Sequence, residues 1–353
     1  MIVLETIKLG KKFRQSEEWA VKNFDLEVHS GEIFGLLGES GCGKTTILRM
    51  IAGFELPSTG VIKLNGKVVS SETTFVEPQN RNIGIVFQDY ALFPHKTVWE
   101  NVCFGLFRYT KTQIKQKAQE ILHICGLDTL EKRYPHQLSG GQMQRVALAR
   151  ALAPEPELIL FDEPFSNIDS MRKFQMREDI LSIIKKTDAT AIFVTHDTKD
   201  VLAMADRVSV IRKGEALQTD TPGRIYTEPL NTYVADFFGK ANIIKAQVSG
   251  KGFLTSMGLI EGSSGVMPEN QKVTLSIRPE DFEITDKSDD CFCGHIVKER
   301  FFGEYKEITC LVPGTNGEET QIIIYVSPHL QCKTPKCYFK PRDRHVNIMR
   351  GEK

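Results

Sequence analysis

A glycine-rich segment near the start of the chain limits the possible folds more than any other feature. It follows the pattern G-x4-G-K-[ST] and consists of Gly38, Glu39, Ser40, Gly41, Cys42, Gly43, Lys44 and Thr45. An apolar run precedes it and a segment with helical character, beginning at Thr46, follows it. Strand, glycine loop and helix in this order predict a loop whose backbone N–H groups surround phosphates at the positive end of a helix. We expect Lys44 to reach the β- and γ-phosphates of a nucleotide and the Thr45 hydroxyl to bind Mg²⁺.

Two carboxylates stand at the end of a second predicted strand. Asp162 and Glu163 directly follow the apolar run 158–161. Because open α/β sheets bind ligands at the carboxyl ends of their strands, we expect Asp162 to hold Mg²⁺ through water. Glu163 is then placed to polarise the water that attacks the γ-phosphate. A helix-capping acidic pair is the alternative interpretation.

A third motif begins another predicted helix. Ser139, Gly140, Gly141 and Gln142 precede the helical run 143–150. The free N–H groups at this helix start imply a second anion site. An ordinary capped helix start is the alternative.

Hydrophobic patterning predicts two domains in a chain of 353 residues, which is long for one ordinary domain. In the first, residues 1–238, alternating segments predict an antiparallel β-layer, and buried strand runs that flank a helix predict a parallel sheet. A mostly helical insertion is expected at about 89–155. Short alternating segments in residues 239–353 predict a small all-β, OB-like domain.

Composition and hydrophobic patterning bear on the binding partners and the cellular location of the protein. Lys plus Arg total 45 and Asp plus Glu total 45, so charge alone does not hold nucleic acid or an anionic membrane. The chain has neither an apolar run of about 18–20 residues nor a signal-peptide core, and we expect a cytoplasmic protein.

The eight cysteines are interpreted as reduced thiols. Cys42 lies inside the glycine loop, where a disulfide would be disruptive. Cys291 and Cys293 form C-x-C, and Cys332 and Cys337 form C-x4-C, spacings that fit the common C-x2-C zinc knuckle poorly. We expect ordinary thiols there, with a metal site as the less favoured alternative.

The order and spacing of the motifs resemble those of the ABC ATPases over about the first 235 residues. The resemblance is carried by residues 38–45, Gln88, 138–142, 158–163, 166–169 and His196. In that family the signature serine and glycines of one subunit close on the ATP held by the Walker A loop of the other. One copy of each motif therefore implies a homodimer with two composite sites.

The resemblance also implies roles for single residues. Gln88 would touch Mg²⁺ and the lytic water, His196 would contact the γ-phosphate, and Asp169 would lie in a loop that crosses the dimer interface. Adenine would stack on Phe13, with Trp19 as runner-up. An exposed glutamine, a capping histidine and core aromatic rings are the respective alternatives.

Two further segments bear on this resemblance. The chain has Ser-Asn-Ile-Asp at 166–169, where the family commonly has Ser-Ala-Leu-Asp. Segment 90–102 resembles the region of importer ATPases that helps to grip the coupling helix of the membrane channel. A small local core is the competing interpretation of that segment.

The C-terminal part resembles the accessory domain of the maltose, polyamine, sulfate and ferric iron importer ATPases, chiefly through residues 275–281. Segments 133–138 and 151–157 look most like the ferric iron group, so ferric iron uptake is the hypothesis. The alternatives are uptake of polyamines, uptake of sulfate or molybdate, and uptake of sugars.

An importer ATPase implies ATP and Mg²⁺, integral membrane permease subunits and a periplasmic or surface substrate-binding protein. It also implies a peripheral position at the cytoplasmic face of the inner membrane. The rival class, an ABC ATPase that acts on nucleic acid, predicts a coiled-coil or zinc insertion between the motifs, and the sequence has neither. A regulatory protein with an inactive nucleotide site is disfavoured because Lys44, Glu163 and His196 are all present.

Overall fold

The computed structural model describes residues 1–14, 16–166, 170–250, 252–262, 267–288, 291–315, 317–331, 334–342 and 346–349. Asp169 and Cys332, which the sequence analysis singled out, lie outside these described residues. The chain divides into two units, Met1–Pro222 and Gly223–Lys353. Within the described part of the chain, no helix is long and apolar enough to cross a membrane.

A six-stranded sheet forms the centre of the first unit, in the order β10-β9-β3-β8-β7-β6. Its strands are β3 (Ile33–Gly38), β6 (Ile83–Val86), β7 (Leu158–Asp162), β8 (Ala191–Thr195), β9 (Arg207–Arg212) and β10 (Glu215–Asp220). Strands β9, β3, β8, β7 and β6 pair in parallel, and β10 is antiparallel to β9. Every residue of β3 and β8 is buried, as expected for a parallel sheet that is covered on both faces. The predicted parallel sheet is confirmed.

A smaller antiparallel sheet, ordered β2-β1-β4-β5, forms the predicted β-layer. Its strands are β1 (Ile2–Lys12), β2 (Trp19–His29), β4 (Thr59–Leu64) and β5 (Lys67–Ser70). Helix α1 (Lys44–Ala52) shares one hydrophobic core with both sheets. Phe24 of β2, Ile47 of α1 and Ile192 of β8 all belong to that core and are fully buried. The helix that follows the glycine loop is therefore held between two sheets.

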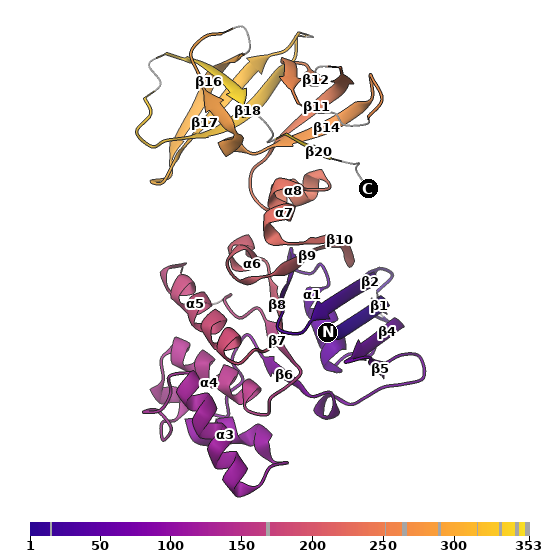
Figure 1. Ribbon diagram of the computed structural model, residues 1–353, viewed down its shortest axis with the longest axis vertical. Helices are drawn as coiled ribbons and strands as arrows, with labels where there is room; N and C mark the ends of the chain where they lie inside the picture. Colours follow the sequence, from indigo (N-terminus) through magenta and orange to yellow (C-terminus); the bar gives the residue numbers. More distant parts are fainter. Residues whose placement is uncertain are drawn as a thin grey trace. The chain divides into compact units, whose positions relative to one another are not determined.

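The expected helical insertion lies on the other side of the six-stranded sheet from the β-layer (Figure 1). It contains α2 (Val98–Cys103), η2 (Phe104–Leu106), α3 (Lys111–Ile124), η3 (Pro135–Gln137) and α4 (Gly140–Leu152), and a short η1 (Pro78–Asn80) precedes β6. Capping boxes begin α2, α3 and α4 and satisfy the first free N–H groups of each helix. Two more helices, α5 (Ser170–Lys186) and α6 (Thr198–Met204), flank β8 in the chain.

The second unit is mainly β-structure, as predicted. In the described residues β13-β12-β11-β14-β20 form one five-stranded sheet and β15-β19-β16-β17-β18 another. The strands are β11 (Asn242–Ser249), β12 (Gly252–Thr255), β13 (Gly258–Glu261), β14 (Lys272–Ile277), β15 (Phe282–Ile284), β16 (Phe292–Phe301), β17 (Lys306–Pro313), β18 (Glu319–Val326), β19 (Lys336–Pro341) and β20 (Asn347–Met349), with η4 (Pro279–Asp281) before β15. Both sheets contribute to a single core, so this set of strands is larger than one OB-like barrel.

Two short helices, α7 (Pro222–Thr227) and α8 (Thr232–Phe237), precede these strands. The sequence pattern changes at about residue 239, whereas the structural division falls at Pro222. The difference arises because Arg278 donates to the carbonyl oxygens of Tyr226, Ala235 and Gly239, at 2.8–2.9 Å for the shortest contact to each. That side chain ties both helices to the second unit.

Candidate active site

The glycine loop connects β3 to α1 at the carboxyl edge of the parallel sheet. Lys44 is only 4% exposed, and its ammonium donates to the carbonyl oxygens of Gly38 and Glu39, both at 2.8 Å. Gly43, at the N-cap of α1, has φ of 110°, and a Cβ at this position would lie 2.3 Å from the carbonyl oxygen of Ala20. Only glycine fits such a position, so the loop geometry is fixed by the sequence.

Asp162 ends β7 beside the start of α1. The Thr45 hydroxyl donates to Asp162 Oδ1 at 3.2 Å. Burial raises the pKa of the Asp162 carboxyl, although the hydrogen bond from Thr45 and the charge of Arg49 act in the opposite direction. A carboxylate and a hydroxyl at this separation supply the oxygen ligands that Mg²⁺ prefers, so the pair fits the expected metal.

Glu163 and His196 meet at the ends of β7 and β8. Glu163 Oε2 lies 3.6 Å from His196 Nδ1, and the two side chains are 23% and 48% exposed. Glu163 has φ of 48°, in the left-handed region, and Ser166 Oγ donates to its carbonyl oxygen at 3.1 Å. Such a backbone costs about 1–3 kcal/mol and is concentrated at functional sites. The strained turn thus lies where the carboxylate comes close to His196.

Ser139 caps α4, and this helix start lines a pocket. The Ser139 hydroxyl accepts from the N–H of Gln142, whose side chain accepts from the N–H of Ser139. Ser139, Gly140, Gly141 and Gln88 line one pocket of about 660 Å³. Space beside Gly140 is open, so the capped helix start leaves room for a ligand. Gln88 therefore lies on the same pocket as the Ser-Gly-Gly motif, although 51 positions separate it from Ser139 in the sequence.

The structure groups the predicted residues into two sets. One set surrounds α1 and the ends of β7 and β8, and the other lines the pocket at the start of α4. Among the described residues, the lining of that pocket includes Gln88 but none of residues 38–45.

Two aromatic rings stand before the glycine loop. Phe13 is 41% and Trp19 38% exposed, which excludes the core alternative for both. The Lys11 ammonium lies 5.1 Å from the centre of the Phe13 ring. Both rings are therefore partly exposed, and their stacking on adenine stays a prediction.

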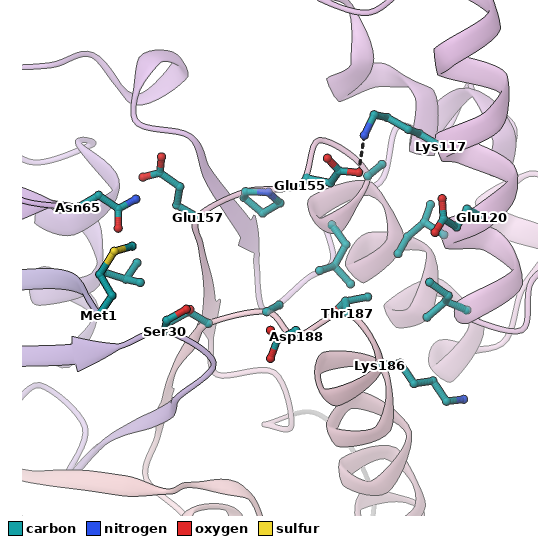
Figure 2. Close-up of a pocket in the computed structure, with 18 residues that line it drawn as sticks. Met1, Ser30, Asn65, Lys117, Glu120, Glu155, Glu157, Lys186, Thr187 and Asp188 are labelled. Atoms are coloured by element: carbon teal, nitrogen blue, oxygen red, sulfur yellow. Dashed lines mark hydrogen bonds and ion pairs between the residues drawn. The ribbon is translucent and has the colours of Figure 1, made fainter.

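Another pocket, of about 490 Å³, opens at the opposite edge of the parallel sheet. Figure 2 shows Met1, Ser30 and Asn65 facing Lys117 and Glu120 of α3 across it. Its lining includes the residues that directly precede β7 and β8, at the amino ends of these strands. It is therefore separate from the loops at the carboxyl ends, where the predicted nucleotide contacts lie.

Sequence reasoning missed a residue that holds the segment after Gln88. Arg150, at the end of α4, donates to the carbonyl oxygens of Tyr90 and Ala91 at 3.0 and 2.6 Å. Tyr90 and Ala91 both have positive φ, 62° and 42°. The signal was a charged residue inside the otherwise apolar run 146–152, the last part of α4.

The described cysteines are free thiols, and a hydrogen bond with Cys310 lowers the pKa of the Cys337 thiol. Burial raises the pKa of the Cys42 thiol, which disfavours the reactive thiolate. Cys291 and Cys293 are partly exposed, and Cys337 is buried. In the part of the chain that the structure describes, no three His, Cys, Asp or Glu side chains are grouped to hold a metal ion.

Comparisons with known proteins agree with this geometry. Residues 21–166 match the family model described as ABC transporter. The spermidine/putrescine import ATP-binding protein PotA of Pseudomonas fluorescens is 45% identical over 276 residues, which cover 74% of this chain and 73% of that protein.

Solved structures are similar as well. CbiO1 from Clostridium perfringens, part of the ABC transporter complex CbiONQ, is 28% identical with a TM-score of 0.59, covering 64% of this chain and 90% of that one. The ATP-binding cassette MJ0796, a dimer in a post-hydrolysis state bound to ADP and Pi, is 30% identical with a TM-score of 0.54, covering 62% and 98%.

Proposed function

Since the chain belongs to the import ATP-binding proteins of ABC transporters and contains an ATP-hydrolysing ABC ATPase domain, we propose that it drives polyamine uptake through a separate membrane permease. The observation that supports polyamines as the transported substrate is the 45% identity to a protein named for spermidine and putrescine import. Polyamines were one of the alternatives drawn from the sequence. The ferric iron hypothesis gains no support from this relative.

In the proposed mechanism the glycine loop binds the phosphates of ATP. Lys44 would exchange its contacts with the Gly38 and Glu39 carbonyls for the β- and γ-phosphates. Backbone N–H groups of residues 38–46, including Thr46, would complete the cradle at the start of α1. Phe13 or Trp19 would stack on the adenine.

Thr45 and Asp162 would hold Mg²⁺, and Gln88, which lines the pocket of Ser139, would be a further contact that links this pocket to the metal. The metal, when bound, supplies positive charge that offsets the charge developing on the phosphates. Asp162 is suited to this role because a buried carboxylate gains most from a nearby cation.

Glu163 would act as the base that polarises the attacking water, and His196 would contact the γ-phosphate. Their separation of 3.6 Å lets both side chains face one reacting group. The two side chains are 23% and 48% exposed, so part of each is accessible to a ligand.

The second set of residues, Ser139, Gly140, Gly141 and Gln142, would contact the ATP held by another copy of the chain. The separation of the two sets within one chain supports this arrangement, because the pocket of Ser139 does not include the glycine loop of the same copy. The similar cassette MJ0796 was solved as a dimer. Asp169 would contribute to the interface of a two-fold homodimer.

The membrane partners would be permease subunits and, through them, a periplasmic or surface substrate-binding protein, which places this chain peripherally at the cytoplasmic face of the inner membrane. CbiO1, a similar structure, is part of a transporter complex. Segment 90–102 would grip the permease. Phe104 and Phe107, which follow it, are 54% and 73% exposed and would extend the apolar contact. The second unit would serve as an accessory or regulatory domain.

Glu163→Gln tests the motor. The variant should bind ATP as the wild type does, lose turnover and accumulate as an ATP-bound dimer, because the amide keeps the shape of the carboxylate but is a poor base. Gel filtration with ATP and Mg²⁺, together with phosphate release, measures both effects. A normal hydrolysis rate would remove Glu163 from the role of base.

The cargo requires a separate measurement. Cells that lack this gene should lose uptake of labelled spermidine and putrescine and regain it with the wild-type gene but not with Lys44→Ala. Uptake of ferric iron, measured in the same cells, should not change. Loss of iron uptake with intact polyamine uptake would contradict the proposed cargo and leave the motor in place.

A further inference from the structure

The loop that carries His196 is fixed on both sides by one buried hydroxyl group. His196 lies between Thr195, the last residue of β8, and Asp197, the N-cap of α6. Thr195 is 4% exposed, and its hydroxyl donates to Asp200 Oδ2 at 2.5 Å. Thr195 Oγ1 in turn accepts from the N–H of Asp197 at 3.0 Å. The two neighbours of His196 are thereby joined to each other and to α6.

Asp200 is held in turn by a buried arginine of α5. Asp200 is 2% and Arg177 8% exposed, and Arg177 Nε donates to Asp200 Oδ1 at 2.7 Å. This leaves Oδ2 for Thr195, so both carboxylate oxygens are bonded. The Arg177 guanidinium also lies 5.9 Å from the ring centre of Phe165, two residues after Glu163. One polar cluster therefore contacts the His196 loop, α5 and the segment after β7.

The chemistry of this cluster indicates that it orients neighbouring groups more than it stabilises the fold. Removing two charges from water is costly, and the attraction of a buried pair often does no more than offset that cost. What a fully bonded buried cluster supplies is one fixed arrangement of its members. The His196 ring is 48% exposed, so packing alone does not fix its direction and the backbone on either side must.

We propose that Thr195, Asp200 and Arg177 form a positioning unit that directs His196 at the γ-phosphate of bound ATP. The inference rests on the role of His196 under the proposed function. None of the three side chains needs to touch the nucleotide. They act through His196 because the Thr195 hydroxyl holds the N–H of Asp197, which follows His196, and links Thr195, which precedes it, to Asp200.

Thr195→Val tests the unit, because valine has nearly the shape of threonine without its hydroxyl. We expect kcat for ATP hydrolysis to fall roughly 10- to 100-fold, as when other orienting groups are lost, while KM and the affinity for ATP stay within about twofold. Thr195→Ser restores the hydroxyl and should restore kcat. The matched control is Thr6→Val in β1, which removes a buried hydroxyl that bonds the Phe24 carbonyl and should leave kcat unchanged.

A wild-type kcat in Thr195→Val, or an equal loss in Thr195→Val and Thr195→Ser, overturns the positioning unit. If the valine variant does not fold, Thr195→Ala against Thr195→Ser gives the same comparison. His196→Ala separates this inference from its premise. Full ATPase activity in His196→Ala would exclude the proposed role of His196 and, with it, the positioning unit. Loss of ATPase activity in His196→Ala together with full activity in Thr195→Val would exclude the positioning unit alone.

Discussion

Asp162 shows how a single residue can favour ligand binding at the expense of the fold. Its carboxylate ends β7, is partly buried and accepts a hydrogen bond from Thr45. Burial raises its pKa, which means that the ionised form is disfavoured in the folded chain compared with the unfolded one. A bound cation would reverse that balance. The nucleotide-free protein therefore carries an unfavourable charge at neutral pH.

Asp162→Asn should raise the melting temperature of the metal-free protein at pH 7 by a few degrees, since about 1 kcal/mol shifts the midpoint by about 2–4 °C in a domain of this size. The amide keeps an acceptor for Thr45 and removes the charge. Because the pKa is raised, the advantage is present above the folded pKa and shrinks as pH falls through it and wild-type Asp162 becomes protonated. Scanning calorimetry with EDTA from pH 7 to pH 4 measures this. A variant that melts earlier than wild type at pH 7 would contradict the account.

At the scale of elements, the buried Arg81 connects the end of a helix to distant segments. Arg81 is 2% exposed and donates to the carbonyl oxygens of Met50 and Ile51 at the end of α1, and to those of Val69 and Val76. Burial lowers the pKa of its guanidinium to about 10, so it stays charged at neutral pH. It thus satisfies the free carbonyls at the end of α1, whose other end begins at Lys44.

Arg81→Met should lower the free energy of unfolding of the first unit by about 2–4 kcal/mol, because buried carbonyl groups lose their donor. Arg108→Met is the matched control. Arg108 is a surface arginine with long contacts of 3.4 Å to Gln79 and Asn80, and its loss should change stability by no more than about 0.5 kcal/mol. Urea unfolding at neutral pH measures both. Equal stability of the two variants would show that Arg81 does not hold the end of α1.

Arg150 should control the segment that follows Gln88. Arg150→Met frees the carbonyls of Tyr90 and Ala91, and their left-handed backbone should then relax. We expect faster amide hydrogen exchange across residues 88–93 in this variant. Arg145→Met, on the same helix, removes a contact to the Cys125 carbonyl instead and should leave those amides unchanged. Identical exchange in the two variants would show that Arg150 does not constrain the segment.

The elements were largely predictable and these connections were not. Continuous apolar runs predicted β3, β7 and β8, and the glycine pattern placed α1, because local sequence decides both features. Arg81 and Arg150 bond backbone carbonyls, which carry no residue identity, at separations of up to 60 residues. The proximity of Thr45 to Asp162 followed from motif order, but the bonds of Thr195 and Asp200 required the structure.

At the scale of the whole molecule, each unit has a hydrophobic core of its own. Two cores predict two transitions in calorimetry. In the slow variant Glu163→Gln, ATP and Mg²⁺ at 100 times the dissociation constant should stabilise the first unit by about 2.7 kcal/mol and so raise its transition temperature. The transition temperature of the second unit should not change. A single transition that moves as a whole would contradict separate units.

The proposed mechanism depends most on the composite site, in which the glycine loop of one copy and Ser139 of the other hold one ATP. The direct measurement mixes two inactive variants, Lys44→Ala and Ser139→Ala, and follows phosphate release. In a mixed dimer one site receives both substitutions and the other receives neither, so an equal mixture should regain activity toward about a quarter of wild type. A mixture no more active than its two components, or full activity in Ser139→Ala alone, would contradict the composite site.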